Sequence, residues 1–331
     1  MTVKELEKAD KNLKLMITKC ANDNNLITED IKPIYDGIYS AELYLESPLK
    51  IMWILKEAYD DVDNKNNPVG GDWSITENIF DEPDKNIINN RTLEMVAYIS
   101  YGILNNILWN KMDYIADTPE IAKSVQQIAY ININKMPAYT TTDDSKLNGH
   151  YHIWKDVLLK QIEVYNPDVM IFGNTYCYFE NDLTGRYKTL SKAHKINVYE
   201  YNDNQLIIDA YHPGNRISDY KEVYVNTIVK SVNKWLSDND KNTMEYKYNF
   251  IKNLAKYLVD NKLKMTGLEV AELMNSNEIY TSYGTEYAGR RGTYKLISDS
   301  YKYFENEGNN EVAENIAIAF IKADGSYAYE N

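Results

Sequence analysis

The sequence predicts an α/β fold of three layers, in which helices cover both faces of a central, mostly parallel sheet. Short apolar segments typical of buried strands alternate with segments of helical spacing, as in parallel sheets with helical crossovers. The clearest strand is Ile51–Leu55, a continuous apolar run that ends at Lys56-Glu57-Ala58-Tyr59-Asp60-Asp61. Ligands bind at the carboxyl ends of strands in open α/β sheets, so this strand end is the first candidate site.

Size and composition set the class of protein. The chain has 331 residues, enough for two domains, and 44% hydrophobic and 26% charged residues are ordinary for a globular protein. Its two cysteines, Cys20 and Cys177, are too few for a disulfide framework, a structural zinc site or an iron–sulfur cluster. The charged start and the lack of an apolar run of ~18 residues predict a cytoplasmic protein without signal peptide or membrane span.

The first part of the chain is predicted to be helical. Residues 1–48 form an expected helical extension, with a helix start at Thr28-Glu29-Asp30-Ile31. After the first strand comes a polar loop, residues 59–72, which ends at Trp73-Ser74-Ile75; loops this long are more often functional than idle. The apolar spacing of residues 89–109 indicates a core helix.

The α/β domain is expected at residues 49–240. A second buried strand is predicted at residues 129–135, where Asn132 and Asn134 face one way and Ile131 and Ile133 the other. The remaining predicted elements are a helix at 153–165, strands at 168–172, 197–201 and 205–210, and a helix at 220–236. The last strand runs into Tyr211-His212-Pro213-Gly214-Asn215-Arg216.

A smaller, mainly helical domain is expected at residues 244–331, after a polar linker at 238–242. Thr266 with Glu269 three residues later is a capping-box pattern at a helix start. The turn at 283–293 carries Arg290 and Arg291 and precedes a helix that Thr293 can cap, which resembles a winged helix-turn-helix. A helix at 311–320 and a strand pair around an Asp-Gly turn complete the domain.

Three strand-end motifs follow one another along the α/β domain. They are Lys56-Glu57-Ala58-Tyr59-Asp60, Asn132 on its strand, and His212-Pro213-Gly214. In a parallel sheet these ends can converge on one crevice. In order and residue type, residues 48–236 resemble the uracil-DNA glycosylase superfamily, whose members carry a strand-end carboxylate motif, an asparagine-bearing strand and a late His-Pro-Ser loop.

The resemblance implies a role for each matching residue. Glu57 falls at the family's water-activating residue and Tyr59 at a pocket tyrosine. Asn132 matches the base-reading asparagine, and Asn134 on the same strand is a second substrate-binding candidate. The remaining matches are Trp73 for the ring that stacks on the flipped base, His212 for the His of His-Pro-Ser, and Asn215 or Arg216 for the side chain that wedges into the duplex.

The chain also departs from the family pattern. Lys135 and Pro137 resemble the iron–sulfur branch, but the cluster cysteines are absent. The main branch has Pro where Ala58 stands and His where Asp60 stands. These departures bear on the substrate more than on the fold.

The chemistry of base excision suits these residue types. The sugar becomes cationic while the base leaves as an anion, so an ionised Glu57 would stabilise the sugar and activate water. A neutral His212 would donate a hydrogen bond to the leaving base, where negative charge develops. Asn132 offers one acceptor and one donor to a pyrimidine edge, and the target base must be flipped out of the duplex.

The sequence therefore predicts a monofunctional DNA glycosylase that needs no cofactor and no metal. No lysine is placed to form an imine, so no lyase step is expected. Arg290 and Arg291 are candidate DNA contacts in the C-terminal domain. The long loop before Trp73 and the small Gly214 predict a roomy pocket, hence a modified pyrimidine in foreign DNA and a role in defence against phage.

Other interpretations remain open. Glu57 can pair with Lys56, Asn132 and Asn134 can satisfy a loop backbone, His212 can be a hydrogen-bonded loop residue, and Trp73 can belong to the core. His150 and His152 are interpreted as structural, and Asp60 with Asp61 lacks the further ligands of a metal site. The net charge of −13 is the wrong sign for binding phosphates and favours the alternative of a catalytically inactive DNA-binding or regulatory module, or an acidic surface for a protein partner.

Overall fold

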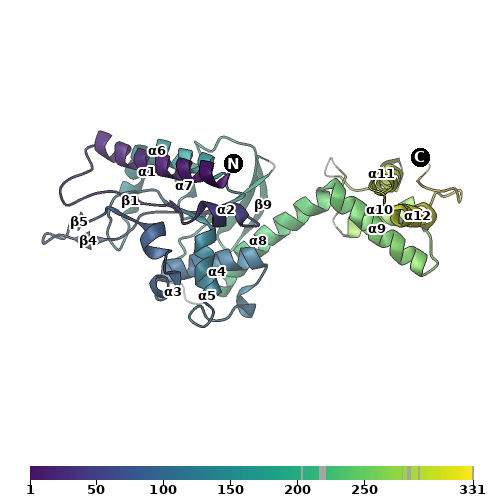
Figure 1. Cartoon of the computed structure of the whole chain (residues 1–331), viewed down its shortest axis with the longest axis horizontal. Helices are drawn as coiled ribbons and strands as arrows, with labels where there is room; N and C mark the ends of the chain where they lie inside the picture. Colours follow the sequence, from purple (N-terminus) through teal and green to yellow (C-terminus); the bar gives the residue numbers. More distant parts are fainter. Residues whose placement is uncertain (203, 216–220, 278, 282–284, 290, 330–331) are drawn as a thin grey trace. The chain divides into compact units, whose positions relative to one another are not determined.

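The computed structural model describes the chain except residues 203, 216–220, 278, 282–284, 290 and 330–331 and the side chains of 239–242. It divides into two compact units, Met1–Asn233 and Lys234–Asn331 (Figure 1). Residues 1–48, expected as an extension, belong to the first of these units. No helix in the described part of the chain is long and apolar enough to cross a membrane.

A seven-stranded sheet organises the first unit, in the order β2-β7-β3-β8-β11-β10-β9. The bounds of these strands are β2 Gly37–Ile38, β7 Ala129–Asn132, β3 Ile51–Leu55, β8 Val169–Gly173, β11 Gln205–Ala210, β10 Ile196–Tyr201 and β9 Tyr187–Ala193. Two small two-stranded sheets flank it: β1 (Ile34–Tyr35) with β6 (Trp73–Ser74), and β4 (Asp61–Val62) with β5 (Pro68–Val69).

The sheet is mixed, so the expectation of a mostly parallel sheet is wrong. The inner pairs β7–β3, β3–β8 and β8–β11 are parallel, whereas β2–β7, β11–β10 and β10–β9 are antiparallel. The reason is the chain after β8, where β9, β10 and β11 follow one another through turns too short for a crossover helix. In the first turn His194 and Lys195 both have positive φ, as tight hairpins favour.

Helices cover both faces of the sheet (Figure 1). On one face, α1 (Val3–Asp23) and α6 (Asp144–Tyr165) enclose an apolar core that includes Met52 and Ile54 of β3. On the other face, Trp53 of β3 donates its indole N–H to Ser100 Oγ of α4 (Arg91–Asn105) at 3.1 Å. Since successive side chains of a strand alternate, the unbroken apolar run of β3 is what burial on both faces requires.

The first unit also contains shorter helices and the start of α8. They are α2 (Ala41–Glu46), η1 (Ile75–Ile79), α3 (Pro83–Asn86), η2 (Trp109–Lys111), α5 (Pro119–Lys123), η3 (Ser124–Gln127) and α7 (Tyr176–Phe179), while α8 spans Lys221–Asn242. The predicted linker at 238–242 is therefore wrong, because the helix continues through it. The stretch contains neither Gly nor Pro, and Lys234 pairs with Asp238 one turn later at 3.2 Å.

The helix start predicted at Thr28 is also wrong. Residues 24–33 form an irregular segment in which Lys32 N–H donates to Gly70 O at 2.8 Å and Gly70 N–H donates to Asp30 O at 2.8 Å. The segment ends at Pro33, and the residue before a proline, here Lys32, is disfavoured in helical conformation. This segment therefore runs beside the loop that precedes Trp73.

The second unit has its own apolar core and consists mainly of helices: α9 (Met244–Asp260), α10 (Gly267–Ser276), α11 (Arg291–Asn306) and α12 (Asn310–Ala319). The capping box of Thr266 and Glu269 is formed as predicted. Thr293 is not a cap, because α11 begins at Arg291 and Thr293 lies buried inside its first turn. The strands β12 (Met265–Thr266) and β13 (Phe320–Ile321) are parallel, and the expected strand pair around the Asp-Gly turn is reduced to one bridge, Ile321 to Tyr327.

Candidate functional site

The ends of β3 and β7 stay in register beyond the strands themselves. Asn134 N–H donates to Lys56 O at 2.9 Å, which keeps the residues that follow β3 and β7 in register. Asn134 Nδ2 then donates to Glu57 Oε2 at 3.2 Å, while its Oδ1 accepts from Met136 N–H at 3.1 Å. The amide of Asn134 is thus fixed with its N–H₂ group toward the carboxylate of Glu57.

Glu57 and Asn134 line a pocket of about 760 Å³. Two residues of α6, Lys146 and His150, stand on its wall, and burial lowers the pKa of His150 while the charge of Glu57 opposes that shift. Apolar side chains complete the wall, among them Leu26, Ile31, Pro68, Met136, Pro137 and Ile153. Sequence reasoning missed His150, because α6 begins at Asp144 rather than at the predicted residue 153, so its face toward the strand ends was not recognised.

His212 follows β11 at the same edge of the sheet. Gly173 at the end of β8 leaves room for the turn at Pro213, since a Cβ added there would lie 3.0 Å from Pro213 Cδ. Gly214 N–H donates to His212 Nδ1 at 3.2 Å, which assigns the imidazole proton to Nε2. Burial and the nearby Lys56 ammonium lower the pKa of His212 to about 4, so the ring is neutral near pH 7 and carries one N–H donor.

Lys56 interacts with Asp144 of α6 and lies near His212. Its Nζ lies 2.5 Å from Asp144 Oδ1 at the first turn of α6, and both charges act on His212. Glu57, the next residue, faces Asn134 instead. Neither His212, which follows β11, nor Asn132 of β7 is among the residues that line the pocket of Glu57.

A buried charged network fixes the end of β7. Asp36 accepts from Lys135 Nζ at 2.7 and 2.9 Å, from Gln161 Nε2 at 2.8 Å and from Asn132 N–H at 2.7 Å. Lys135 and Asp36 are both almost fully buried. The network ties β7 to α6 on the sheet face opposite to the one that Asn132 occupies, as the alternation of the strand predicts.

Asn132 itself carries an unusual feature. Its side chain is 2% exposed, and its Oδ1 has no hydrogen-bond partner among the described residues. A buried acceptor without a partner costs free energy, and a hydrogen-bond donor on a ligand would offset that cost. This is the acceptor that a base-reading asparagine offers.

We expect the change Asn132→Leu to leave the free energy of unfolding within about 1 kcal/mol of wild type, because it removes an unsatisfied acceptor at similar volume. The same change should lower the affinity for substrate strongly. Urea denaturation measures the first effect and ligand-binding titration the second. An Asn132→Leu protein that unfolds much more easily but binds normally would assign Asn132 a structural role.

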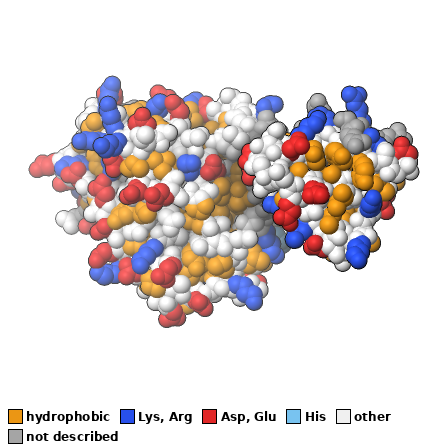
Figure 2. Space-filling model, turned by 45° about the vertical axis from the view of Figure 1, so that its right-hand side comes forward, with side chains coloured by type: hydrophobic (Ala, Val, Ile, Leu, Met, Phe, Trp, Pro, Cys, Tyr) orange, Lys and Arg blue, Asp and Glu red, His pale blue; other side chains and the backbone are white. Residues whose placement is uncertain are grey.

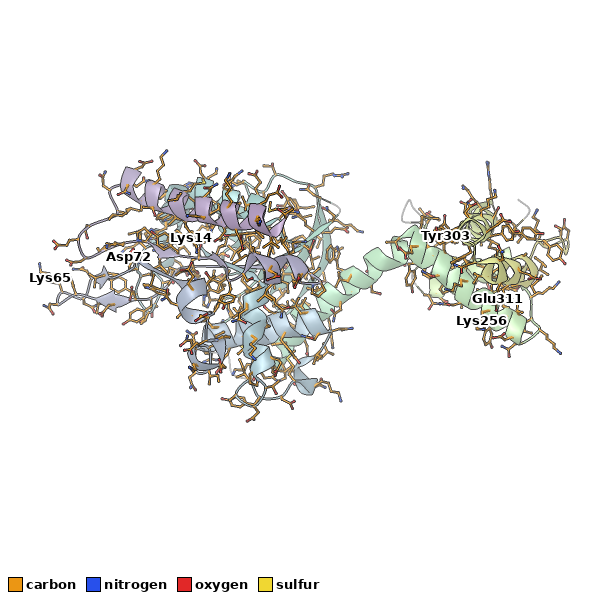
Figure 3. The ribbon with its side chains drawn as sticks, viewed as in Figure 1. Lys14, Lys65, Asp72, Lys256, Tyr303 and Glu311 are labelled. Atoms are coloured by element: carbon orange, nitrogen blue, oxygen red, sulfur yellow. The ribbon has the colours of Figure 1, made fainter. Side chains whose placement is uncertain are left out.

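The two aromatic candidates lie elsewhere. Tyr59 is 51% exposed, and its backbone bridges to Ala138. Trp73 donates its indole N–H to Asp60 Oδ2 at 2.7 Å, and Gly71 N–H donates to the same oxygen at 2.6 Å. Trp73 lines a second cavity of about 380 Å³, whose wall also includes Lys14 and Asp72 (Figure 3). Neither aromatic ring lines the pocket of Glu57.

The carboxylate of Asp60 is thus already hydrogen-bonded to Gly71 and Trp73, at the end of the loop in which it lies. Among the described residues, no three His, Cys, Asp or Glu side chains gather as a metal site requires.

The remaining candidates are the proposed DNA contacts. Asn215 is exposed, and its backbone N–H donates to His212 O at 3.0 Å. Arg291 is exposed at the first position of α11 in the second unit. Arg216 and Arg290 lie outside the described residues.

Comparisons of the chain with protein-family models, curated proteins and solved structures gave no match. The function is therefore argued from the chemistry of the site.

Proposed function

We propose that the protein is a monofunctional DNA glycosylase, which hydrolyses the N-glycosidic bond of a flipped-out uracil or modified pyrimidine. The observation that supports this most is the placement of a hydrogen-bonded carboxylate, Glu57, and a neutral imidazole donor, His212, after the carboxyl ends of β3 and β11, two parallel strands with β8 between them. The four adjacent parallel strands β7, β3, β8 and β11 form the core of a uracil-DNA glycosylase-like, three-layer domain in this proposal. The second unit, as a winged helix-turn-helix-like module, helps to engage DNA.

Each group has a defined task in the reaction. As the bond to the base lengthens, Glu57 stabilises the cationic sugar and accepts a proton from the attacking water. His212 donates its Nε2–H to the base oxygen that gains negative charge, and its low pKa keeps this donor uncharged. Asn132 Oδ1 accepts from an N–H of the base edge.

A lyase step is not part of the proposal. The two lysines that flank the candidate residues already have partners: Lys56 is paired with Asp144, and Lys135 is buried against Asp36. Neither is placed as a free amine nucleophile.

The size of the pocket favours a substrate larger than uracil. About 760 Å³ beside Glu57 lies in the range that encloses drug-sized ligands, which exceeds the need of an unsubstituted pyrimidine. A pyrimidine with a bulky substituent, as in modified phage DNA, fits this volume. Such a substrate makes the enzyme a defence against foreign DNA.

The protonation of His212 gives a prediction with a clear sign. In NMR titrations its imidazole should become protonated near pH 4 rather than near the ordinary 6.5, with the proton of the neutral ring on Nε2. Because the unfolded chain binds this proton at higher pH than the folded chain, His212 makes the protein lose stability as pH falls from 6.5 to 4. His212→Ala should remove this contribution and lower base release about 10²-fold or more at pH 7. An ordinary titration near 6.5 would contradict the assigned environment.

The proposal is tested by a screen for abasic sites, read as strand breaks after alkali treatment, on DNA with uracil, mismatched bases or phage-type modified pyrimidines. Release of one class of base, without strand breaks before alkali, is the expected result. Excision confined to uracil, with modified DNA intact, would remove the defence role. No release from any substrate, with DNA binding retained, would favour the inactive binding module that the −13 charge also suggests.

A further inference from the structure

The hairpin of β9 and β10 carries a concentrated positive charge on an acidic protein. Residues 186–195 contain Arg186, Lys188, Lys192 and Lys195 and no Asp or Glu, whereas the whole chain has a net charge of −13. These four side chains are exposed. On the face of the first unit drawn in Figure 2, by contrast, acidic and basic side chains alternate over short distances.

The register of the sheet places this hairpin near the end of β11, which precedes His212. Lys192 of β9 pairs with Asn197 of β10, and Asn197 pairs with Asp209 of β11, three residues before His212. Two strand spacings, about 10 Å, therefore separate Lys192 from the end of β11. The turn at His194 and Lys195 lies at the same edge of the sheet as the carboxyl ends of the parallel strands.

Acidic groups near the hairpin neutralise part of its charge. Glu200 lies 3.6 Å from Lys188, and Asp209 accepts from Asn197 Nδ2 at 2.8 Å, with its pKa raised by burial. Lys192 and Lys195 form no ion pair within the described part of the chain. Two cations are thus available to a ligand on the side of His212.

A structural explanation for these lysines also exists. β9 is an edge strand, and lysines on an edge strand discourage pairing with another chain. That explanation does not account for Lys195, which lies in the turn outside the ladder, with φ of 61°. Nor does it require the charge to lie at the end of the sheet where the candidate site is.

We propose that the β9–β10 hairpin is a phosphate-binding ribbon, which holds the DNA backbone next to the nucleotide that enters the site. The inference rests on the proposed function in taking DNA as the polyanion. Lys192 and Lys195 contact phosphates, and Lys188 extends the contact along β9. The ribbon compensates locally for the repulsion between an acidic protein and DNA.

The test compares two triple variants of the full chain with equal loss of charge. The hairpin variant is Lys188→Thr, Lys192→Thr and Lys195→Asn, because Thr suits a strand and Asn tolerates positive φ. The control variant replaces three exposed lysines of α1 with Gln: Lys4, Lys8 and Lys19. Binding of a fluorescein-labelled DNA duplex and of its single strand is followed by anisotropy, from roughly 50 to 200 mM salt.

The hairpin variant should bind DNA about tenfold more weakly at low salt, and the slope of log K against log salt should become shallower by about 2 to 3. The control variant should bind like the wild type. Equal effects in both variants, or no binding by the wild type at low salt, would overturn the inference. Self-association of the hairpin variant in gel filtration, with DNA binding unchanged, would assign the lysines to edge protection instead.

Binding is measured here without base release. If DNA binding by the wild type depends on the hairpin but no base is excised, the glycosylase proposal is contradicted and the phosphate-binding role of the hairpin is supported. If the protein excises a base but the hairpin variant binds DNA as well as the wild type, the glycosylase proposal is supported and the phosphate-binding role of the hairpin is contradicted.

Discussion

Glu57→Gln is expected to reduce base release by about 10² to 10⁴-fold while DNA binding stays within a few-fold of wild type. Glutamine keeps the shape of the side chain, and its Oε1 can still accept from Asn134 Nδ2, so the pocket should remain intact. What is lost is the negative charge that stabilises the cationic sugar and accepts the proton of water. Single-turnover formation of abasic sites, on the substrate that the wild type accepts, measures this loss.

The matched control for this change is Glu163→Gln. Glu163 lies on α6 and pairs with Lys160 on the surface, with a side chain that is 70% exposed. It undergoes the same chemical change outside the site and should retain full activity. A Glu57→Gln enzyme that keeps more than about a tenth of wild-type activity would exclude Glu57 as the catalytic carboxylate.

Lys135→Met should lower the free energy of unfolding by about 3 to 5 kcal/mol, because it leaves the buried carboxylate of Asp36 without its cation. For a unit of this size the loss corresponds to roughly 6 to 20 °C in Tm. Urea denaturation followed by tryptophan fluorescence is the suitable measurement, since four of the five tryptophans lie in the first unit.

Two further variants identify the cause of that loss. Lys160→Met removes a surface lysine of α6, which pairs with Glu163, and should cost less than about 1 kcal/mol. Adding Asp36→Asn to Lys135→Met removes the unpaired charge and should restore part of the stability. If the double variant is no more stable than Lys135→Met alone, the loss comes from packing rather than from the isolated carboxylate.

The sequence was sufficient to predict the core of the sheet. β3 has the predicted bounds, and β8, β10 and β11 lie within a residue of theirs. β3, β8 and the middle of β11 are apolar runs, whereas β10 contains both apolar and polar residues. β9 was not predicted, because its exposed, polar residues lack the alternation of a half-buried strand. The edge strands β9 and β2 both pair antiparallel with their neighbours, and neither of them was predicted.

The candidate site was predictable only in part, for a related reason. The positions of Glu57, Asn132 and His212 at strand ends follow from local pattern. The partners of these residues come from distant segments: Asp144 and His150 from the first turns of α6, and Asp36 from before β3. Side-chain pairing over such separations leaves no periodic signal in one sequence. Trp73 illustrates the limit, since its indole is held by Asp60 rather than directed to the pocket.

The Asp36 network also has a consequence for the order of folding. Its hydrogen bonds join residues 96, 99 and 125 positions apart, so the strand end that carries Asn132 cannot be completed by local contacts. During synthesis, Asp36 must stay hydrated until α6 has left the ribosome, because burial without Lys135 and Gln161 would leave its negative charge unpaired. Contacts of such high sequence separation form slowly. We therefore expect the edge of the sheet that carries the candidate site to assemble late, after α1 has formed and the apolar strands have collapsed.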